Sequence, residues 1–302
     1  MSVLHALRLE LRGFLEYVLL PGLAVFMPWP LAYRLLKQLA RYPGLYEEEW
    51  RPALAQALSM GLVEIDDPDG WAWRYRACRL VDHADFWLSR TRRARRWLPR
   101  HSDRRGDWPA LETPAVGAFF HWCAGMWGVR ALLDAGHHSS VLAGRFSKRS
   151  MGGARLGYWY GHLRLNELSR ASGGPLIYAP GTVKQSLDAL TAGRWVIGTP
   201  DVPPTETRFS IPVRLFGRDG HMPEGLLLIA RQARVPVVVF TMALDFDSGR
   251  RELRIEGPFD PDDPDLMQRI ADTWQALIRE KSWAFTLWPA MPAYFAASNE
   301  QE

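Results

Sequence analysis

From residue 114 onward, short apolar runs alternate with segments of helical pattern, and this alternation constrains the fold more than any other feature. The apolar runs have the length of strands and lie at 115–120, 139–143, 176–179, 195–199, 209–215, 235–244 and 251–255. Helical patterns lie at 125–135, 183–192, 224–233 and 265–281. Such alternation is typical of a largely parallel sheet covered by helices on both faces. We therefore predict an α/β fold with a mixed, largely parallel sheet, whose run 251–255 pairs antiparallel with 235–244.

Most of the chain before residue 114 reads as helices, with turns at 42–44 and 66–70. The composition is that of an ordinary globular protein, with 47% hydrophobic and 23% charged residues. We find no long Ser/Gly linker and no repeat of fixed period. The sequence therefore predicts a helical segment at 1–40 and a single α/β domain over 41–302.

The helical segment contains an apolar stretch at 14–36, which Glu16 and three prolines interrupt. Its cleanest apolar run, 17–27, is about half of the ~20 residues that a membrane-spanning helix needs. We therefore expect a shallow or re-entrant membrane anchor, with Trp29 and Tyr33 at the level of the lipid headgroups. An ordinary buried helix is the alternative interpretation.

Basic residues are concentrated in one region, although the formal net charge is only +4. The cluster consists of arginines, namely Arg90, Arg92, Arg93, Arg95, Arg96, Arg100, Arg104 and Arg105. It is interpreted either as a solvated helix and loop or as a surface that faces anionic lipid headgroups. We do not expect nucleic acid as a partner, because no nucleic-acid-binding module surrounds the cluster.

Cys78 and Cys123 are the only cysteines, and they lie far apart in the sequence. They do not form a disulfide scaffold or a Cys-x-x-Cys metal pair, so we expect a reducing compartment. The adjacent His137 and His138 follow a helix and are interpreted as solvated. No Gly-rich nucleotide loop and no metal-ligand spacing is evident, so we expect neither a cofactor nor a metal.

His121 is the best single candidate for a catalytic residue. It follows the first apolar run, and ligands on largely parallel sheets bind at the carboxyl ends of the strands. A helix begins shortly afterwards, and its N-terminus would favour negative charge that develops nearby. Small residues, Ala124 and Gly125, are expected to leave space for a ligand. Imidazole is also the most common general base near neutral pH.

Five segments in this order resemble the lipid A late acyltransferases, the lauroyl and myristoyl transferases, within the wider lysophospholipid and glycerol-3-phosphate acyltransferase fold. The segments are LEYVLLPGLAVFMPWPLAYRLLKQLARY, AVGAFFHWCAGMWGVRALLDAG, SVLAGRFSKRSM, TVKQSLDALTAGRWVIGTPDVPP and FSIPVRLFGRDGHMPEGLLLIARQARVPVVVF. The resemblance covers nearly the whole chain. It implies an enzyme at the cytoplasmic side of the cell inner membrane, held as a peripheral or single-anchor protein. It also implies that the acyl donor is acyl carrier protein or acyl-CoA.

In that family a histidine takes the proton of the acceptor hydroxyl, and an acid five positions later orients the imidazole. The histidine corresponds to His121, but the position of the acid is occupied by Met126. Methionine cannot accept the ring N–H or stabilise an imidazolium. Another carboxylate could serve instead, either Asp201 after a strand or Glu224. Alternatively, the enzyme works without an orienting acid, or the chain only binds lipid or an acyl carrier.

The resemblance also points to further residues at the site. Arg145 matches an arginine of the family and could bind phosphate or polarise an acyl carbonyl, and Lys148 extends its positive charge. Gly217 is interpreted as a turn residue that shapes the acyl pocket, and Arg218 as a contact of the acceptor. Cys123 could form a thioester intermediate, although an inert buried cysteine is the simpler interpretation.

Together these features predict transfer of a fatty or related acyl group from a carrier thioester to a hydroxyl or amine of a lipid-like acceptor. His121 would be the base, and Arg145 and Asp201 would position or stabilise the substrates. The acceptor is expected to be lipid A-like, or a specialised lipid or polyene. A catalytically silent protein that binds lipid or an acyl carrier is the alternative.

Overall fold

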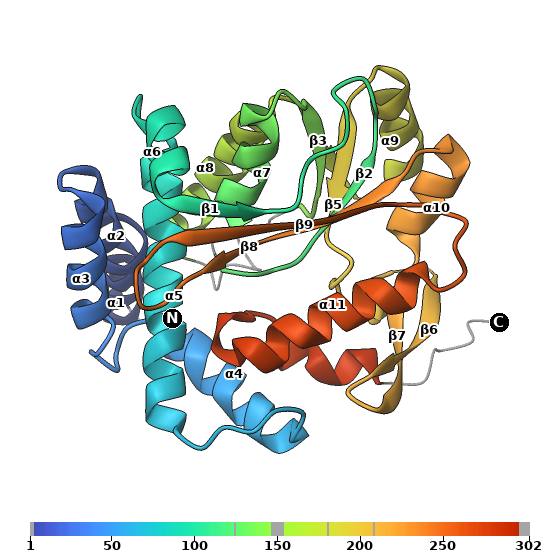
Figure 1. The fold of residues 1–302 in the computed structure, drawn as a ribbon. Helices are drawn as coiled ribbons and strands as arrows, with labels where there is room; N and C mark the ends of the chain where they lie inside the picture. Colours follow the sequence, from blue (N-terminus) through green and yellow to red (C-terminus); the bar gives the residue numbers. More distant parts are fainter. Residues whose placement is uncertain (1–2, 124, 146–153, 180, 208, 296–302) are drawn as a thin grey trace.

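The computed structural model describes residues 3–123, 125–145, 154–179, 181–207 and 209–295, and for residues 3–5 and 206 it describes the backbone alone. The first part of the chain is helical and lies at one end of the molecule (Figure 1). Its elements are α1 (Val3–Gly13), the π-helix η1 (Phe14–Leu19), α2 (Leu20–Gly22), the 3₁₀ turn η2 (Leu23–Val25) and α3 (Trp29–Leu39). Within the described residues, none of the helices has both the length and the apolar character needed to span a bilayer.

Three more helices connect this end to the sheet, and the longest of them, α5, begins at a capped N-terminus. The side chain of Asp67 accepts a hydrogen bond of 2.8 Å from the Gly70 N–H, which is the usual way to satisfy a free amide at a helix start. The elements are α4 (Glu47–Met60), α5 (Pro68–Ser89), α6 (Ala94–Arg100) and the first strand, β1 (Ser102–Arg105).

The central sheet has seven strands in the order β1-β9-β8-β2-β5-β3-β4. Strands β8, β2, β5, β3 and β4 are parallel, and β9 pairs antiparallel with β8. The strands are β2 (Val116–Phe119), β3 (Ser139–Ala143), β4 (Leu176–Tyr178), β5 (Trp195–Gly198), β8 (Val237–Leu244) and β9 (Arg251–Phe259). The predicted α/β fold with a mixed, largely parallel sheet is confirmed.

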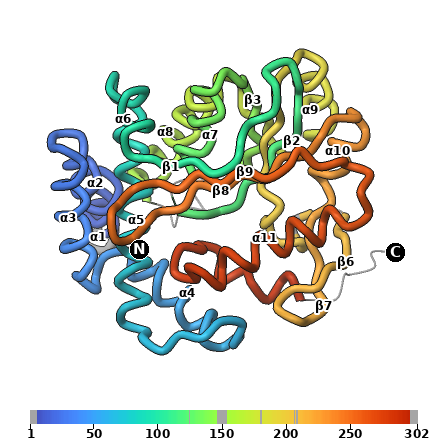
Figure 2. The backbone as a smooth tube through the Cα atoms, viewed as in Figure 1, coloured from blue at the N-terminus to red at the C-terminus, as the bar shows by residue number. Residues whose placement is uncertain are grey.

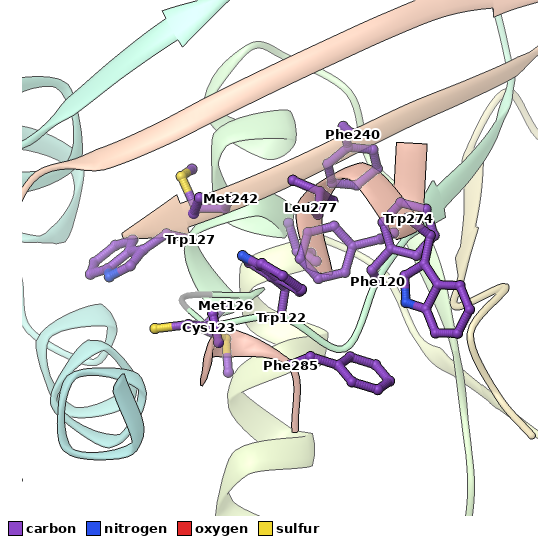
Figure 3. Close-up of a cluster of buried hydrophobic side chains, with 14 of the residues drawn as sticks. Phe120, Trp122, Cys123, Met126, Trp127, Phe240, Met242, Trp274, Leu277 and Phe285 are labelled. Carbon is purple, nitrogen blue, oxygen red and sulfur yellow. The ribbon is translucent and has the colours of Figure 1, made fainter. Parts of the chain in front are cut away.

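Helices α7 and α8 lie on one side of this sheet and α11 on the other (Figures 1 and 2). The helices of this part are α7 (Gly125–Asp134), α8 (Arg155–Ser172), α9 (Thr182–Thr191), α10 (Gly225–Ala233) and α11 (Leu266–Glu280). Large buried side chains from α7, β8 and α11 fill the core around the sheet, as Figure 3 shows for Trp127, Phe240 and Trp274. This packing holds the central strands in place, and the candidate site lies at their carboxyl ends.

The run 209–215 does not join the central sheet. It forms β6 (Ser210–Leu215), which pairs antiparallel with β7 (Arg218–Pro223) as a separate hairpin. Phe216 and Gly217 form its turn with φ of 52° and 78°, a left-handed backbone that suits glycine. The sequence analysis predicted neither β7 nor the 18-residue α8, because both segments are too polar to show a clear apolar period.

Trp29 and Tyr33 are buried, so their predicted position among lipid headgroups is wrong. The Trp29 indole N–H donates to the Gly249 carbonyl at 2.8 Å, and the Tyr33 hydroxyl donates to the Phe246 carbonyl. Both acceptors belong to the turn between β8 and β9. These two side chains therefore attach α3 to the sheet.

A fully buried ion pair reinforces the same junction. Asp85 of α5 binds the guanidinium of Arg251 on β9. The guanidinium lies 4.0 Å from the ring centroid of Trp29 and 4.8 Å from that of Trp97. A buried charge is tolerated only when it is paired and hydrogen-bonded, and both conditions are met here.

The two cysteines are paired with each other, and this corrects the expectation that they form no disulfide. Cys78 on α5 and Cys123 after β2 form a disulfide, with Cα atoms 5.8 Å apart. The disulfide forms because the fold brings α5 alongside the end of β2. The spacing of the two cysteines in the sequence gave no sign of this long-range contact. His137 is likewise buried, with its ring 5.0 Å from that of Trp195, and is not solvated as expected.

Candidate active site

His121 lies at the carboxyl end of β2, in the centre of the sheet, as its position in the sequence predicted. Its ring Nδ1 is 2.9 Å from Oδ1 of Asp201. The backbone N–H of His121 donates to the other carboxylate oxygen of Asp201, Oδ2, at 2.7 Å. One carboxylate thus holds both the ring and the backbone of the histidine.

Asp201 follows β5, the strand that pairs with β2. The side chain is completely buried, whereas that of His121 is 40% exposed. A buried carboxylate is stable only with hydrogen-bond donors, and the two groups of His121 are such donors. With Nδ1–H donated to Asp201, the second ring nitrogen, Nε2, carries the lone pair of the neutral imidazole.

The C-terminal segment 282–294 contacts Asp201 and the residue next to His121. The Tyr294 hydroxyl, fully buried at the end of the 3₁₀ turn η5 (Trp288–Tyr294), donates to the backbone carbonyl of Asp201. Trp122, next to His121, forms an antiparallel bridge with Phe285, which follows the turn η4 (Ser282–Ala284). Sequence reasoning missed this segment, since neither contact has a local signal.

Met126 is buried in the first turn of α7 and belongs to the apolar cluster drawn in Figure 3. It therefore offers no polar group to the imidazole. Glu224, the second carboxylate considered above, forms an ion pair of 3.2 Å with Arg231 on α10. Of the alternatives left open by the sequence, the geometry favours Asp201 as the orienting carboxylate.

Arg145 lies just beyond β3, which pairs with β5, and is exposed. Its guanidinium lies 5.3 Å from the ring centroid of Tyr178 at the end of β4. The carboxyl ends of four neighbouring strands thus bear His121, Asp201, Arg145 and Tyr178 in that order across the sheet. This row combines an imidazole, a buried carboxylate and a guanidinium. Lys148 lies outside the described residues.

The other expected contacts do not gather at this row. Cys123 is buried in the disulfide, so a thioester intermediate on its sulfur is excluded for this state. Gly217 lies in the hairpin turn, and Arg218 donates to the Met60 carbonyl of α4 at 3.4 Å. Gly125 does not leave open space for a ligand: a Cβ there would come within 3.0 Å of the Phe119 ring. Ala124 lies outside the described residues.

The rest of the described structure offers no comparable grouping around His121. A cavity of about 470 Å³ lies between the end of α3, α4 and the start of α5, and is lined by Arg41, Trp50, Trp73 and Arg76 among others, but not by His121. In the described part of the chain, no group of three or more His, Cys, Asp and Glu side chains is arranged to hold a metal ion. The row at the carboxyl ends of the strands remains the best-organised candidate site.

A search of protein-family models and a search of curated proteins each found no match for this chain.

Proposed function

We propose that this protein is an acyltransferase, which moves a fatty or related acyl group from a carrier thioester to a hydroxyl or amine of a lipid-like acceptor. The observation that carries the proposal is the contact of 2.9 Å between His121 Nδ1 and the buried carboxylate of Asp201. A buried acid behind a partly exposed imidazole is the arrangement of a general base. The resemblance to lipid A late acyltransferases supplies the reaction class.

The proposed reaction uses both ring nitrogens of His121. Nε2 takes the proton from the acceptor hydroxyl or amine while that atom attacks the thioester carbonyl carbon. The negative charge of Asp201 stabilises the imidazolium that forms. The tetrahedral intermediate then collapses, the carbon–sulfur bond breaks, and the imidazolium returns its proton to the departing thiolate. The products are the acylated acceptor and the free carrier thiol.

Arg145 is suited to the donor. An exposed guanidinium can bind a phosphate with two parallel hydrogen bonds or polarise an acyl carbonyl. Both acyl carrier protein and acyl-CoA present a phosphate on the pantetheine arm that carries the thioester. In this proposal Arg145 binds the donor while His121 activates the acceptor.

The test is release of free thiol from a panel of acyl carrier thioesters and acyl-CoAs in the presence of lipid-like acceptors. We expect His121→Ala to abolish acyl transfer. The matched control is His138→Ala, since His138 is exposed and lies just before β3, at the opposite end of that strand. Equal turnover of wild type and His121→Ala would refute the mechanism. Donor binding without turnover in the wild type would favour a carrier-binding protein.

A further inference from the structure

The N-terminal helices present their apolar side chains outward. Seven large apolar side chains between residues 7 and 31 are exposed, against six in all the rest of the described chain. The seven are Leu7, Leu11, Phe14, Leu15, Leu19, Phe26 and Leu31. Leu7 is 64% exposed and Phe26 is 85% exposed. The spacing of three and four residues from Leu7 to Leu15 places these side chains on one face of the helix.

The acidic side chains of α1 and η1 bind the protein instead of facing water, whereas Arg8 of α1 is exposed. The carboxylate of Glu10 accepts hydrogen bonds of 2.6 and 2.9 Å from the first two amides of α8, those of Arg155 and Leu156. Glu16 is buried and accepts from the Tyr46 N–H at 2.6 Å and from Arg12 at 3.0 Å. A surface helix of a soluble protein has the opposite orientation, with its polar face in water. The exposed apolar face therefore calls for a nonaqueous partner.

Unpaired positive charge adjoins this face. Helix α6 contacts α3 through the rings of Trp97 and Trp29, whose centroids are 5.3 Å apart, and both helices lie at the same end of the molecule (Figures 1 and 2). Five exposed arginines in and beside α6 form no ion pair with any described residue. They are Arg92, Arg93, Arg95, Arg96 and Arg100. Arg8 on α1 is also exposed.

We propose that the outer face of α1, η1, η2 and α3 lies in the surface of an anionic lipid bilayer, with the arginines of α6 against the headgroups. An apolar stripe with adjoining basic residues is the composition of a helix that lies in a membrane interface. The positive charge complements phosphate-bearing lipids, whereas an apolar protein partner would leave it unmatched. This mode of binding needs no helix that crosses the bilayer.

The docked orientation would bring the candidate site to the bilayer. The Phe246 carbonyl, just past the carboxyl end of β8, accepts from Lys37 of α3 at 3.0 Å, and β8 runs parallel to β2, so α3 lies on the side of the sheet toward which the strand end with His121 points. The β8–β9 turn meets the N-terminal helices there in Figure 1. A lipid acceptor could thus remain in the membrane while its headgroup reaches the site.

The test is co-flotation of the full-length protein with vesicles of phosphatidylcholine alone or with added phosphatidylglycerol. We expect binding to the anionic vesicles and much weaker binding to the neutral ones. The variant Leu7→Gln/Leu11→Gln/Leu15→Gln keeps good helix formers and should lower the partition coefficient at least tenfold. Its control is Leu58→Gln/Leu228→Gln, which changes exposed leucines on α4 and α10.

The charge is tested separately with Arg92→Gln/Arg93→Gln/Arg96→Gln. A basic residue near an anionic membrane changes the partition coefficient about fivefold, so three should lower it on the order of 100-fold. The control Lys184→Gln/Arg269→Gln/Arg279→Gln removes three exposed charges on α9 and α11 and should bind as wild type does.

Vesicle binding is independent of the proposed chemistry, because His121→Ala should float as well as the wild type. The proposal is overturned if the leucine variant floats as efficiently as the wild type, or if the wild type binds neither vesicle. It is also overturned if sedimentation without lipid shows a wild-type dimer that the leucine substitutions convert to a monomer. That result would identify the apolar face as an interface between two copies of the chain.

Discussion

Replacement of Asp201 by asparagine should disable the candidate base without disturbing the fold. In the native site both carboxylate oxygens accept, one from the His121 N–H at 2.7 Å and one from the ring at 2.9 Å. Asparagine has one oxygen and one NH₂ group, so it can accept only one of these bonds. If its oxygen keeps the backbone N–H, the NH₂ group faces Nδ1. The imidazole must then carry its proton on Nε2, where it cannot act as a base.

The expected loss follows from charge as well as from the tautomer. Two unit charges ~4 Å apart interact by about 4 kcal/mol at an effective dielectric constant of ~20. Loss of that stabilisation of the imidazolium corresponds to a rate decrease of roughly 10³-fold. The equivalent Asp→Asn change in Ser-His-Asp triads lowers kcat about 10⁴-fold. We therefore expect kcat/KM of Asp201→Asn to fall by about 10³–10⁴-fold.

The assay is thiol release from acyl carrier thioesters, measured across a range of pH. Thermal unfolding of the same preparation checks that the fold is retained. The matched control is Asp188→Asn, an exposed position on α9, which should leave the rate unchanged. A folded Asp201→Asn variant with kcat/KM within tenfold of wild type would show that the carboxylate does not orient the base.

Three further predictions concern the surroundings of the site and the buried polar groups. Tyr294→Phe removes the donor to the Asp201 carbonyl, and we expect kcat to fall about tenfold and the free energy of unfolding by about 1–3 kcal/mol. The control is Tyr75→Phe, whose hydroxyl forms no hydrogen bond within the described residues and whose loss should have little effect on turnover. Met126→Glu places an unpaired carboxylate in the core, so chemical denaturation should show a loss of about 3–5 kcal/mol with no gain in rate. Burial, together with the charges of Arg79 and Arg164, lowers the pKa of His83 well below 6.5. Below pH 6.5 the unfolded chain therefore binds a proton at His83 that the folded protein does not. The free energy of unfolding should then decrease by about 1.4 kcal/mol for each unit by which the pH is lowered. Denaturation measured at several pH values should show a smaller slope for His83→Asn.

Both members of the candidate pair were predictable because each follows a strand with a local signal. His121 follows the apolar run 115–120, and Asp201 follows 195–199. Apolar runs report the burial of a strand, but they contain no information on which strand becomes its neighbour. The choice between Asp201 and Glu224 depended on the pairing of β2 with β5, which is a property of the whole sheet. The sequence therefore left Asp201 and Glu224 as the two candidate acids, and the fold places Asp201 in contact with His121.

Contacts between distant segments were not predictable for the same physical reason. Tyr294 and Asp201 are 93 residues apart, and Cys78 and Cys123 are 45 apart. Neither distance along the chain says anything about distance in space. Trp29 illustrates a different limit: an aromatic residue beside apolar ones suits a membrane interface and a protein core equally well. The burial of Trp29, its hydrogen bond to Gly249 and its contact with Arg251 show that this indole faces the sheet.

In the proposed mechanism, the position of the acid also determines how His121 is held. An acid at position 126 would lie on the same helix that follows His121, and would leave the ring attached to a single element. Asp201 instead comes from the neighbouring strand and binds the ring and the backbone of His121 together. Because β2 and β5 are paired in the centre of the sheet, that pairing fixes the backbone of His121 relative to the segment that carries Asp201. Met126 packs in the apolar core, and in the proposed mechanism a carboxylate at that position would have no orienting role.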